Sequence, residues 1–280
     1  MQKNDTLGLW IQIDKAGAIA HFFGTIAVIA LITQDVKKHA TPRPIFLACM
    51  EGVSFLFHVG YLYGNTVIPQ WREMQYPNTA KWLEYSLTAA LGVLALIPSA
   101  TFDHRDAYAA TLVGIVSAGV LQQQAGKHLD VYAYKGNAKA HVAPIAIMFG
   151  GAWIWQIGEY ALVWHLSDVH TAAHRFLVLL PYFCFYGLFG VLSFARLYKA
   201  WTRTSAEPNE LRYQFEAAYS LLGTVSKITL LTTTLVHIFW SHLYARWTGL
   251  STTIGGILTL CVVGSFIVTK HARKAVELLF

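Results

Sequence analysis

Charged side chains are scarce in this chain of 280 residues, since Asp, Glu, Lys and Arg together make up only 13% of it. A typical globular domain carries about 25% charged residues. Hydrophobic residues make up 55% of the sequence and aromatic residues 14%, so too few polar side chains remain to cover a water-facing surface. This shortage argues against a soluble domain or a disordered chain, and it indicates that lipid is the main solvent of the protein.

Cysteine pairs and long basic runs are also missing. The three cysteines all lie within apolar stretches, so no disulfide framework is expected. The net charge is +6, yet no basic run is longer than Lys37-Lys38, and the basic residues lie between apolar stretches. This distribution is typical of a membrane protein and not of a surface that binds nucleic-acid phosphates, so no nucleic-acid partner is expected.

Eight apolar windows are long enough to cross about 30 Å of hydrocarbon as helices. Four windows carry no charge and four carry one: 16–34, 107–126, 176–195 and 247–269, then 44–71 with Glu51, 82–102 with Glu84, 140–167 with Glu159 and 217–245 with Lys227. Because backbone groups in lipid must be satisfied internally, each window is predicted to be a helix. The sequence therefore predicts an all-α membrane protein, with seven helices in residues 1–245 and an additional C-terminal transmembrane helix and cytoplasmic tail in residues 246–280.

Lysine and arginine are unevenly divided between the two sides of the predicted bundle. With the N-terminus in the cytoplasm, fourteen of them fall on inner segments and six on outer segments. The positive-inside rule then favours a cytoplasmic N-terminus and, if the eighth helix spans, a cytoplasmic C-terminus. We expect an integral protein of the plasma membrane.

Three glutamates and one lysine lie inside the windows. An ionisable group at the bilayer centre costs roughly 2.5–3.5 kcal/mol on insertion scales, so each needs a partner or a function. Lys227 has ten uncharged residues before it in its window and eighteen after it, which places its amine too deep to reach water easily. Spacing alone leaves two interpretations open for Lys227, a structural pair with a carboxylate or a Schiff base with a carbonyl cofactor.

Two segments, 81–88 (KWLEYSLT) and 220–227 (SLLGTVSK), resemble the corresponding segments of the heliorhodopsins. In that family a glutamate in a basic-Trp-x-Glu-Tyr-Ser segment is the counterion of a retinal Schiff base on the seventh-helix lysine, and the N-terminus is cytoplasmic. The resemblance covers about residues 10–245, and the eighth helix departs from it. It implies a seven-helix rhodopsin bundle, a homodimeric light-absorbing photoreceptor in membrane lipid, all-trans retinal on Lys227, and Glu84 as counterion.

The resemblance and the clustering of aromatic residues also predict a retinal pocket. Thr88, one turn after Glu84, is expected to hydrogen-bond the ion pair. Gly223, four residues before Lys227, is expected to leave room for water or for Thr224. The residues expected to contact retinal are Tyr85, Thr88, Ser117, Val120, Trp155, Tyr182, Phe185 and Tyr186.

A proton path is a further hypothesis. His21 and His58 match histidines that line an inner cavity near the counterion in heliorhodopsins, where they could accept a proton. Topology places Glu51 and Glu159 in the outer half, across the Schiff base from the histidines. Light-driven proton transport, as in some viral members of the family, would use all four. The alternative for the glutamates is a neutral carboxyl group hydrogen-bonded to Gln156, Tyr160 or the backbone.

Other classes of function remain as alternatives. A transporter or channel without a chromophore would use Lys227 and the three glutamates as a charge network, and it would be colourless. A haem protein is disfavoured because His21, His58 and His237 lack the paired spacing of two-haem cytochromes. No catalytic triad, P-loop or zinc motif is present, so an enzyme is not expected. The histidines near the fifth span, His165, His170 and His174, are expected to be solvated and not to bind a metal.

Overall fold

The computed structural model describes residues 5–34, 42–67, 78–97, 105–166 and 180–239. These residues form seven α-helices and one short 3-10 helix, without a strand. The elements are α1 (Asp5–Gln34), α3 (Pro42–Val67), α5 (Thr79–Leu96), α6 (Arg105–Lys135), η2 (Ala138–His141), α7 (Val142–Leu166), α9 (Leu180–Ala200) and α10 (Asn209–Phe239). The predicted all-α class is confirmed. The predicted eighth helix, 247–269, and the tail after it lie outside the described residues.

Three of these helical segments are long and apolar enough to cross a membrane: Thr6–Thr33, Arg43–Val67 and Ala138–His165. They contain most of the predicted windows 16–34, 44–71 and 140–167. The other four helices form where windows were predicted, but their described parts do not meet the same criteria of length and apolarity.

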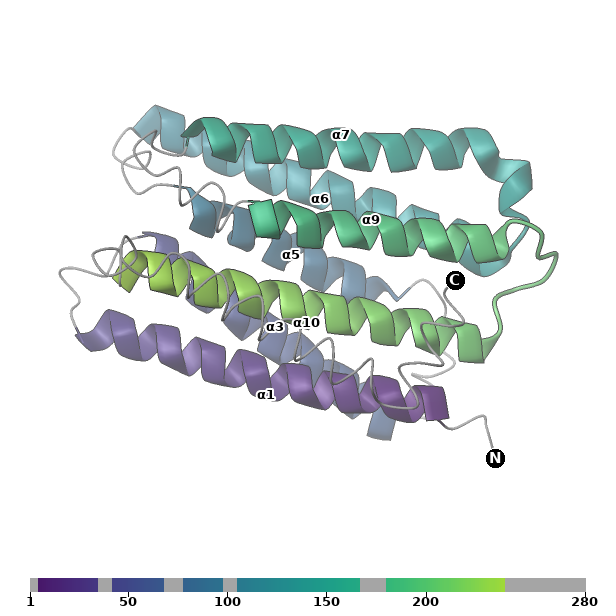
Figure 1. Cartoon of the computed structure of the whole chain (residues 1–280), viewed down its shortest axis with the longest axis horizontal. Coiled ribbons are helices and arrows are strands. Elements are labelled where there is room, and N and C mark those ends of the chain that lie inside the picture. The colour runs from purple at the N-terminus through teal and green to yellow at the C-terminus, as the bar shows by residue number, and fades with distance from the viewer. Residues whose placement is uncertain (1–4, 35–41, 68–77, 98–104, 167–179, 240–280) are drawn as a thin grey trace.

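The helices run side by side along the long axis of the molecule (Figure 1). In this view α1 lies at one edge of the bundle and α7 at the other. Helix α1 packs against α3 and α10, α3 packs against α5, and α5 packs against α6. Helix α6 also contacts α7 and α9, while α9 contacts α10. The bundle therefore has α5, α6, α9 and α10 between its two edges.

Apolar and polar side chains are distributed in the way expected of a protein surrounded by lipid. Large apolar side chains lie on the outside, for example Ile147, which is 75% exposed, and Ile154, which is 72% exposed. The interior contains fully buried ionisable residues, among them Asp14, Glu51 and Arg196. Since lipid solvates the outer face, the polar groups of the interior must find their partners inside the bundle.

Candidate functional site

Lys227 on α10 forms an ion pair with Glu84 on α5, through its Nζ and the Oε1 atom of the carboxylate. Both side chains are at least nine-tenths buried. Tyr61 on α3 donates a hydrogen bond of 2.9 Å to the second carboxylate oxygen of Glu84. The ring of Tyr85 lies 5.3 Å from Lys227 Nζ, close enough for a cation–π contact. The two residues on which the family resemblance rests are therefore in direct contact.

One expectation about the surroundings of this pair is wrong in detail. The Thr88 hydroxyl donates to the main-chain oxygen of Glu84, at 2.9 Å, and not to the ion pair. Gly223 lines a small cavity with Glu84 and Tyr61, and a Cβ atom there would lie 3.1 Å from the Tyr85 hydroxyl. Thr224 lies 3.5 Å from His58 Nε2.

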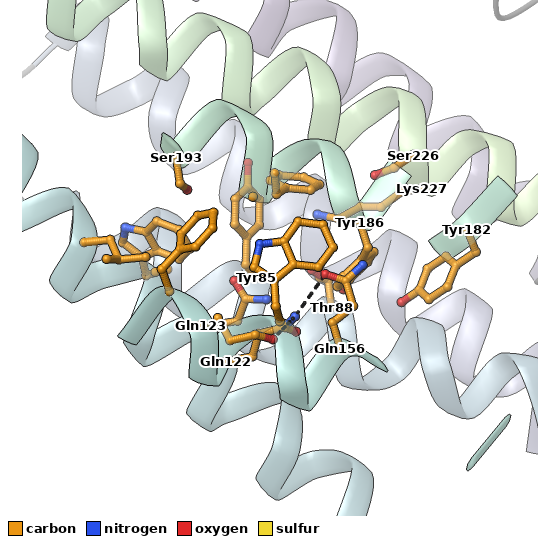
Figure 2. Close-up of a pocket in the computed structure, with 18 of the residues that line it drawn as sticks. Tyr85, Thr88, Gln122, Gln123, Gln156, Tyr182, Tyr186, Ser193, Ser226 and Lys227 are labelled. Atoms are coloured by element: carbon orange, nitrogen blue, oxygen red, sulfur yellow. Dashed lines mark hydrogen bonds between the residues drawn. The ribbon is translucent and has the colours of Figure 1, made fainter. Parts of the chain in front are cut away.

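Lys227 lies on the wall of a cavity that contains about 770 Å³ of space free of atoms, including the part open to the outside (Figure 2). Four of the residues expected around retinal line it: Tyr85, Thr88, Tyr182 and Tyr186. Further aromatic rings come from α5, α7 and α9, namely Trp82, Phe149, Trp153 and Phe189. The cavity is thus a largely aromatic chamber with one lysine amine in its wall.

The other four expected contacts lie elsewhere. Ser117 and Val120 are on the exposed face of α6, because the helix turns Gln122, Gln123 and Gly126 toward the cavity instead. Trp155 is 45% exposed, and its neighbour Trp153 lines the cavity in its place. Phe185 is half-buried but does not line the cavity, whereas Phe189, one turn further along α9, does.

Glycines shape the cavity by admitting aromatic rings. A Cβ atom at Gly190 would lie 2.7 Å from the Trp153 ring, and one at Gly187 would lie 3.3 Å from it. A Cβ atom at Gly126 on α6 would lie 2.4 Å from the ring of Trp82. Trp82 is held there by a hydrogen bond of 2.8 Å from its indole nitrogen to Asp130. Glycines on α6 and α9 therefore determine which rings of α5 and α7 enter the cavity.

The two histidines belong to a buried column of ionisable residues between α1 and α3. His21 Nδ1 lies 2.6 Å from Glu51, and His58 Nδ1 lies 3.1 Å from Asp14. The two imidazole rings stack at 5.3 Å between centroids. Asp14 also accepts a hydrogen bond from the Ser220 hydroxyl on α10. All four ionisable side chains are at most 2% exposed.

This column corrects the expected division between histidines and glutamates. Glu51 does not lie across the ion pair from the histidines but is bonded directly to His21. Asp14 was missed, although it precedes His21 by seven residues, as Glu51 precedes His58 by seven. A spacing of seven puts Asp14 and His21 on one face of α1, and Glu51 and His58 on one face of α3. This spacing could have predicted the column from the sequence. Glycines on the facing side of α1 make room, since Cβ atoms at Gly17 and Gly24 would lie 2.8 Å from His58 and 3.0 Å from Glu51.

Glu159 lies apart from this column. It is 8% exposed and lines a smaller cavity with Tyr160, Tyr182 and Tyr186. Its Oε1 atom has no hydrogen-bond partner, so the expected bond from this oxygen to Gln156, Tyr160 or the backbone is not present. Nothing in the described part of the chain bonds Glu159 to Glu51, so the structure does not bring the two glutamates together.

A second charge cluster lies toward the end of the bundle at which α5 and α10 begin. Lys81 donates to Asp130 at 2.9 Å and to Glu216 at 3.1 Å. Arg196 contacts Asp130 at 3.2 Å and forms a two-pronged pair with Glu207, at 2.5 and 3.1 Å. Asp130 lies beyond the apolar window of its helix. Burial alone would raise its pKa, but the charges of Lys81 and Arg196 outweigh burial and lower the pKa of Asp130 below its ordinary value.

The sequence indicated Lys81 as the basic residue of the segment that resembles the heliorhodopsins, and Arg196 only as a positive charge on an inner segment. The structure buries both, and it buries Asp130, Glu207 and Glu216 beside them. By contrast, His165 is exposed as expected, and His170 and His174 lie outside the described residues. The described residues contain no group of three or more side chains suited to hold a metal ion.

Comparisons with protein-family models, with curated proteins and with solved structures gave no match to this chain.

Proposed function

We propose that this chain is a retinal-binding, light-absorbing membrane protein of the heliorhodopsin type, with Lys227 as the attachment point and Glu84 as the counterion. One observation carries the proposal: a buried lysine, paired with a buried carboxylate, lies in the wall of an aromatic cavity. Structural ion pairs also bury lysines, but they do not need a cavity beside the amine. The cavity favours a Schiff base on Lys227 over a structural ion pair.

The residues present fit retinal. The ligand is a long apolar polyene with an aldehyde at one end, and the cavity offers rings along its walls and an amine to react with. The rings come from more than one helix: Tyr85 is on α5, whereas Tyr182 and Phe189 are on α9. Retinal supplies, when bound, the visible absorption and the photoisomerisation that the polypeptide lacks.

The roles of the chain's own residues follow from their contacts. Glu84 balances the positive charge on the Lys227 nitrogen, and Tyr61 fixes the orientation of that carboxylate by donating to its second oxygen. The ring of Tyr61 in turn contacts the ring of His58, at 5.8 Å between centroids. The ion pair is therefore adjacent to the column of Asp14, His58, His21 and Glu51, which can hold and pass protons.

Light-driven proton transport is a second candidate activity of the same site. It is favoured by the continuity of the column, in which two carboxyl–imidazole pairs are joined by stacked rings. We further propose a homodimer in the plasma membrane with both termini on the cytoplasmic side. The cytoplasmic side would be the one that carries Lys135, Lys139 and Lys199.

The visible spectrum of the purified protein, expressed with all-trans retinal, tests the proposal. Wild type is expected to show a visible band that hydroxylamine bleaches, and Lys227→Ala is expected to lack it. Lys15→Ala, which changes an exposed lysine on α1, is the matched control and keeps the band. A folded wild-type protein without colour would overturn the proposal, and it would favour a charge network in a transporter or channel without a chromophore.

A further inference from the structure

The wall of the cavity formed by α6 and α7 carries amide side chains as well as rings. Gln122 and Gln123 come from α6 and Gln156 from α7 (Figure 2). Each is more than nine-tenths buried. A hydrocarbon ligand needs no such wall, because it can satisfy neither the donors nor the acceptors of an amide. A buried amide group without a partner costs about 1–3 kcal/mol, so this wall requires an explanation.

The orientation of two of the amides is fixed by main-chain oxygens. Gln156 donates its amide nitrogen to the main-chain oxygen of Phe183 at 3.2 Å, so its own oxygen faces Gln122. Gln122 donates its nitrogen to that oxygen at 3.5 Å and to the main-chain oxygen of Ala152 at 3.4 Å. The carbonyl oxygen of Gln122 is then left buried and without a partner.

Gln123 adds a complete amide group to the same wall. It lines the cavity, and it makes no hydrogen bond to any part of the chain that the structure describes. The wall therefore presents a free donor and a free acceptor to the cavity, both on Gln123, whereas the Gln122 oxygen is buried. A hydroxyl group has the complementary pattern, since it donates one hydrogen bond and accepts others.

We infer that this amide wall binds an oxygen function on the far end of the ligand, so that the preferred chromophore is a retinal with a hydroxyl group on its ring. The inference rests on the proposed attachment to Lys227. Helix α10, which carries Lys227, packs against α1, α3, α5 and α9, while α6 and α7 lie further toward the other edge of the bundle (Figure 1). A ligand attached at Lys227 that fills the cavity meets α6 and α7 with the end opposite its aldehyde. The ring hydroxyl hydrogen-bonds the amide group of Gln123.

Competition between two chromophores tests this inference. The retinal-free protein is given equal amounts of all-trans retinal and ring-hydroxylated all-trans retinal, the product is reduced with borohydride, and mass spectrometry measures the ratio of the two adducts on Lys227. One additional net hydrogen bond corresponds to a preference of about fivefold for the hydroxylated ligand in wild type. The readout is occupancy, and it does not depend on any light-driven activity.

Variants locate the preference. Gln123→Met keeps side-chain length but removes the amide, and it is expected to bring the adduct ratio close to one while still binding plain retinal. Gln124→Met, on the exposed face of the same helix, is the matched control and keeps the wild-type ratio. An equal or reversed ratio in wild type overturns the inference, as does a preference that survives in Gln123→Met. Absence of both adducts from Lys227 would instead overturn the proposed function.

Discussion

At the scale of single residues, charge balance at Lys227 depends on Glu84. The two carboxylate oxygens of Glu84 have different partners, Lys227 on one and Tyr61 on the other. A buried cation that loses the anion paired with it is costly. Glu84 therefore stabilises the positive charge on Lys227, and Tyr61 fixes the position of the Glu84 carboxylate.

Replacing this anion should change the response of the chromophore to pH. In Glu84→Gln the visible band of the retinal-loaded protein is expected to disappear at a lower pH than in wild type, by roughly two to three pH units, because the neutral amide no longer balances the proton on the Lys227 nitrogen. An absorption titration measures the midpoint. Tyr61→Phe keeps the carboxylate and is expected to move the midpoint less. Identical midpoints in Glu84→Gln and wild type would rule out Glu84 as the counterion.

Gly126 offers a test of packing at one residue. Gly126→Ala places a methyl group against the Trp82 ring, which cannot move freely because Asp130 holds its indole nitrogen. The expected loss of stability is about 1–3 kcal/mol. Gly119→Ala on the same helix is the control, since its Cβ would meet Ala90 at an ordinary 3.5 Å. Thermal unfolding in detergent compares the two, and equal melting temperatures would show that the Trp82 position is not constrained.

At the scale of helices, the cluster around Asp130 joins elements that are distant in the sequence. Lys81 lies on α5, Asp130 on α6 and Arg196 on α9, while Glu207 lies in the segment just before α10. Together with Glu216 on α10, these charges connect four helices at one end of the bundle, the end that also holds the turn between α6 and η2. At that turn Gly136 adopts a φ of 77°, and the next residue, Asn137, donates its main-chain N–H to the oxygen of Arg203.

Removal of the shared carboxylate should loosen this end of the bundle. Asp130→Asn leaves Lys81 and Arg196 with fewer anions, and the expected loss is about 3–5 kcal/mol in the free energy of unfolding. Glu210→Gln, an exposed acidic residue at the start of α10, is the control and should change little. The lowered pKa of Asp130 adds a pH dependence: its stabilisation is present above the ordinary value of 3.8 and is lost as the pH falls below it. Melting temperatures that fall equally with acid in wild type and Asp130→Asn would contradict this assignment.

Helix positions could be predicted from the sequence, but the inward faces of the helices could not. Apolar windows predict helices because lipid leaves the backbone no other way to satisfy its hydrogen bonds. On α7 almost every side is apolar, so nothing local distinguishes Trp153 from Trp155, which point to nearly opposite sides of the helix. The choice is made by Gly187 and Gly190 on α9, which admit the Trp153 ring. Contacts with neighbouring helices determine which side of a uniformly apolar helix faces the cavity. The sequence of that helix alone does not show these contacts.

At the scale of the whole molecule, a polar column runs inside an apolar exterior. Asp14 and His21 on α1 face His58 and Glu51 on α3, and the two helices run in opposite directions, so the two pairs lie one above the other. Glu159 belongs to α7, and no hydrogen bond among the described residues connects it to this column. The column is therefore a continuous set of ionisable side chains beside the ion pair, and Glu159 is not bonded to it in the described part of the chain.

Photocurrents under voltage clamp test transport along this column. Cells that express the wild type are expected to show a current on illumination, and Glu51→Gln and Asp14→Asn are expected to lower it by more than about tenfold, since each removes a proton-binding group. Glu159→Gln is the comparison outside the column and is expected to keep most of the current. Absence of current in pigmented wild type would rule out transport. A current lost only in Glu159→Gln would move the route to α7.

The close packing of α1 against its neighbours limits which substitutions this helix can accept during evolution. Gly17 and Gly24 leave room for the side chains of His58 and Glu51, so even the methyl group of alanine at either position would clash with residues of the column. Gly8 on the same helix faces open space, and alanine there would favour the helix by about 1 kcal/mol. In a library of random variants, Gly8 should therefore accumulate substitutions freely, while Gly17 and Gly24 should change only together with the residues that fill them.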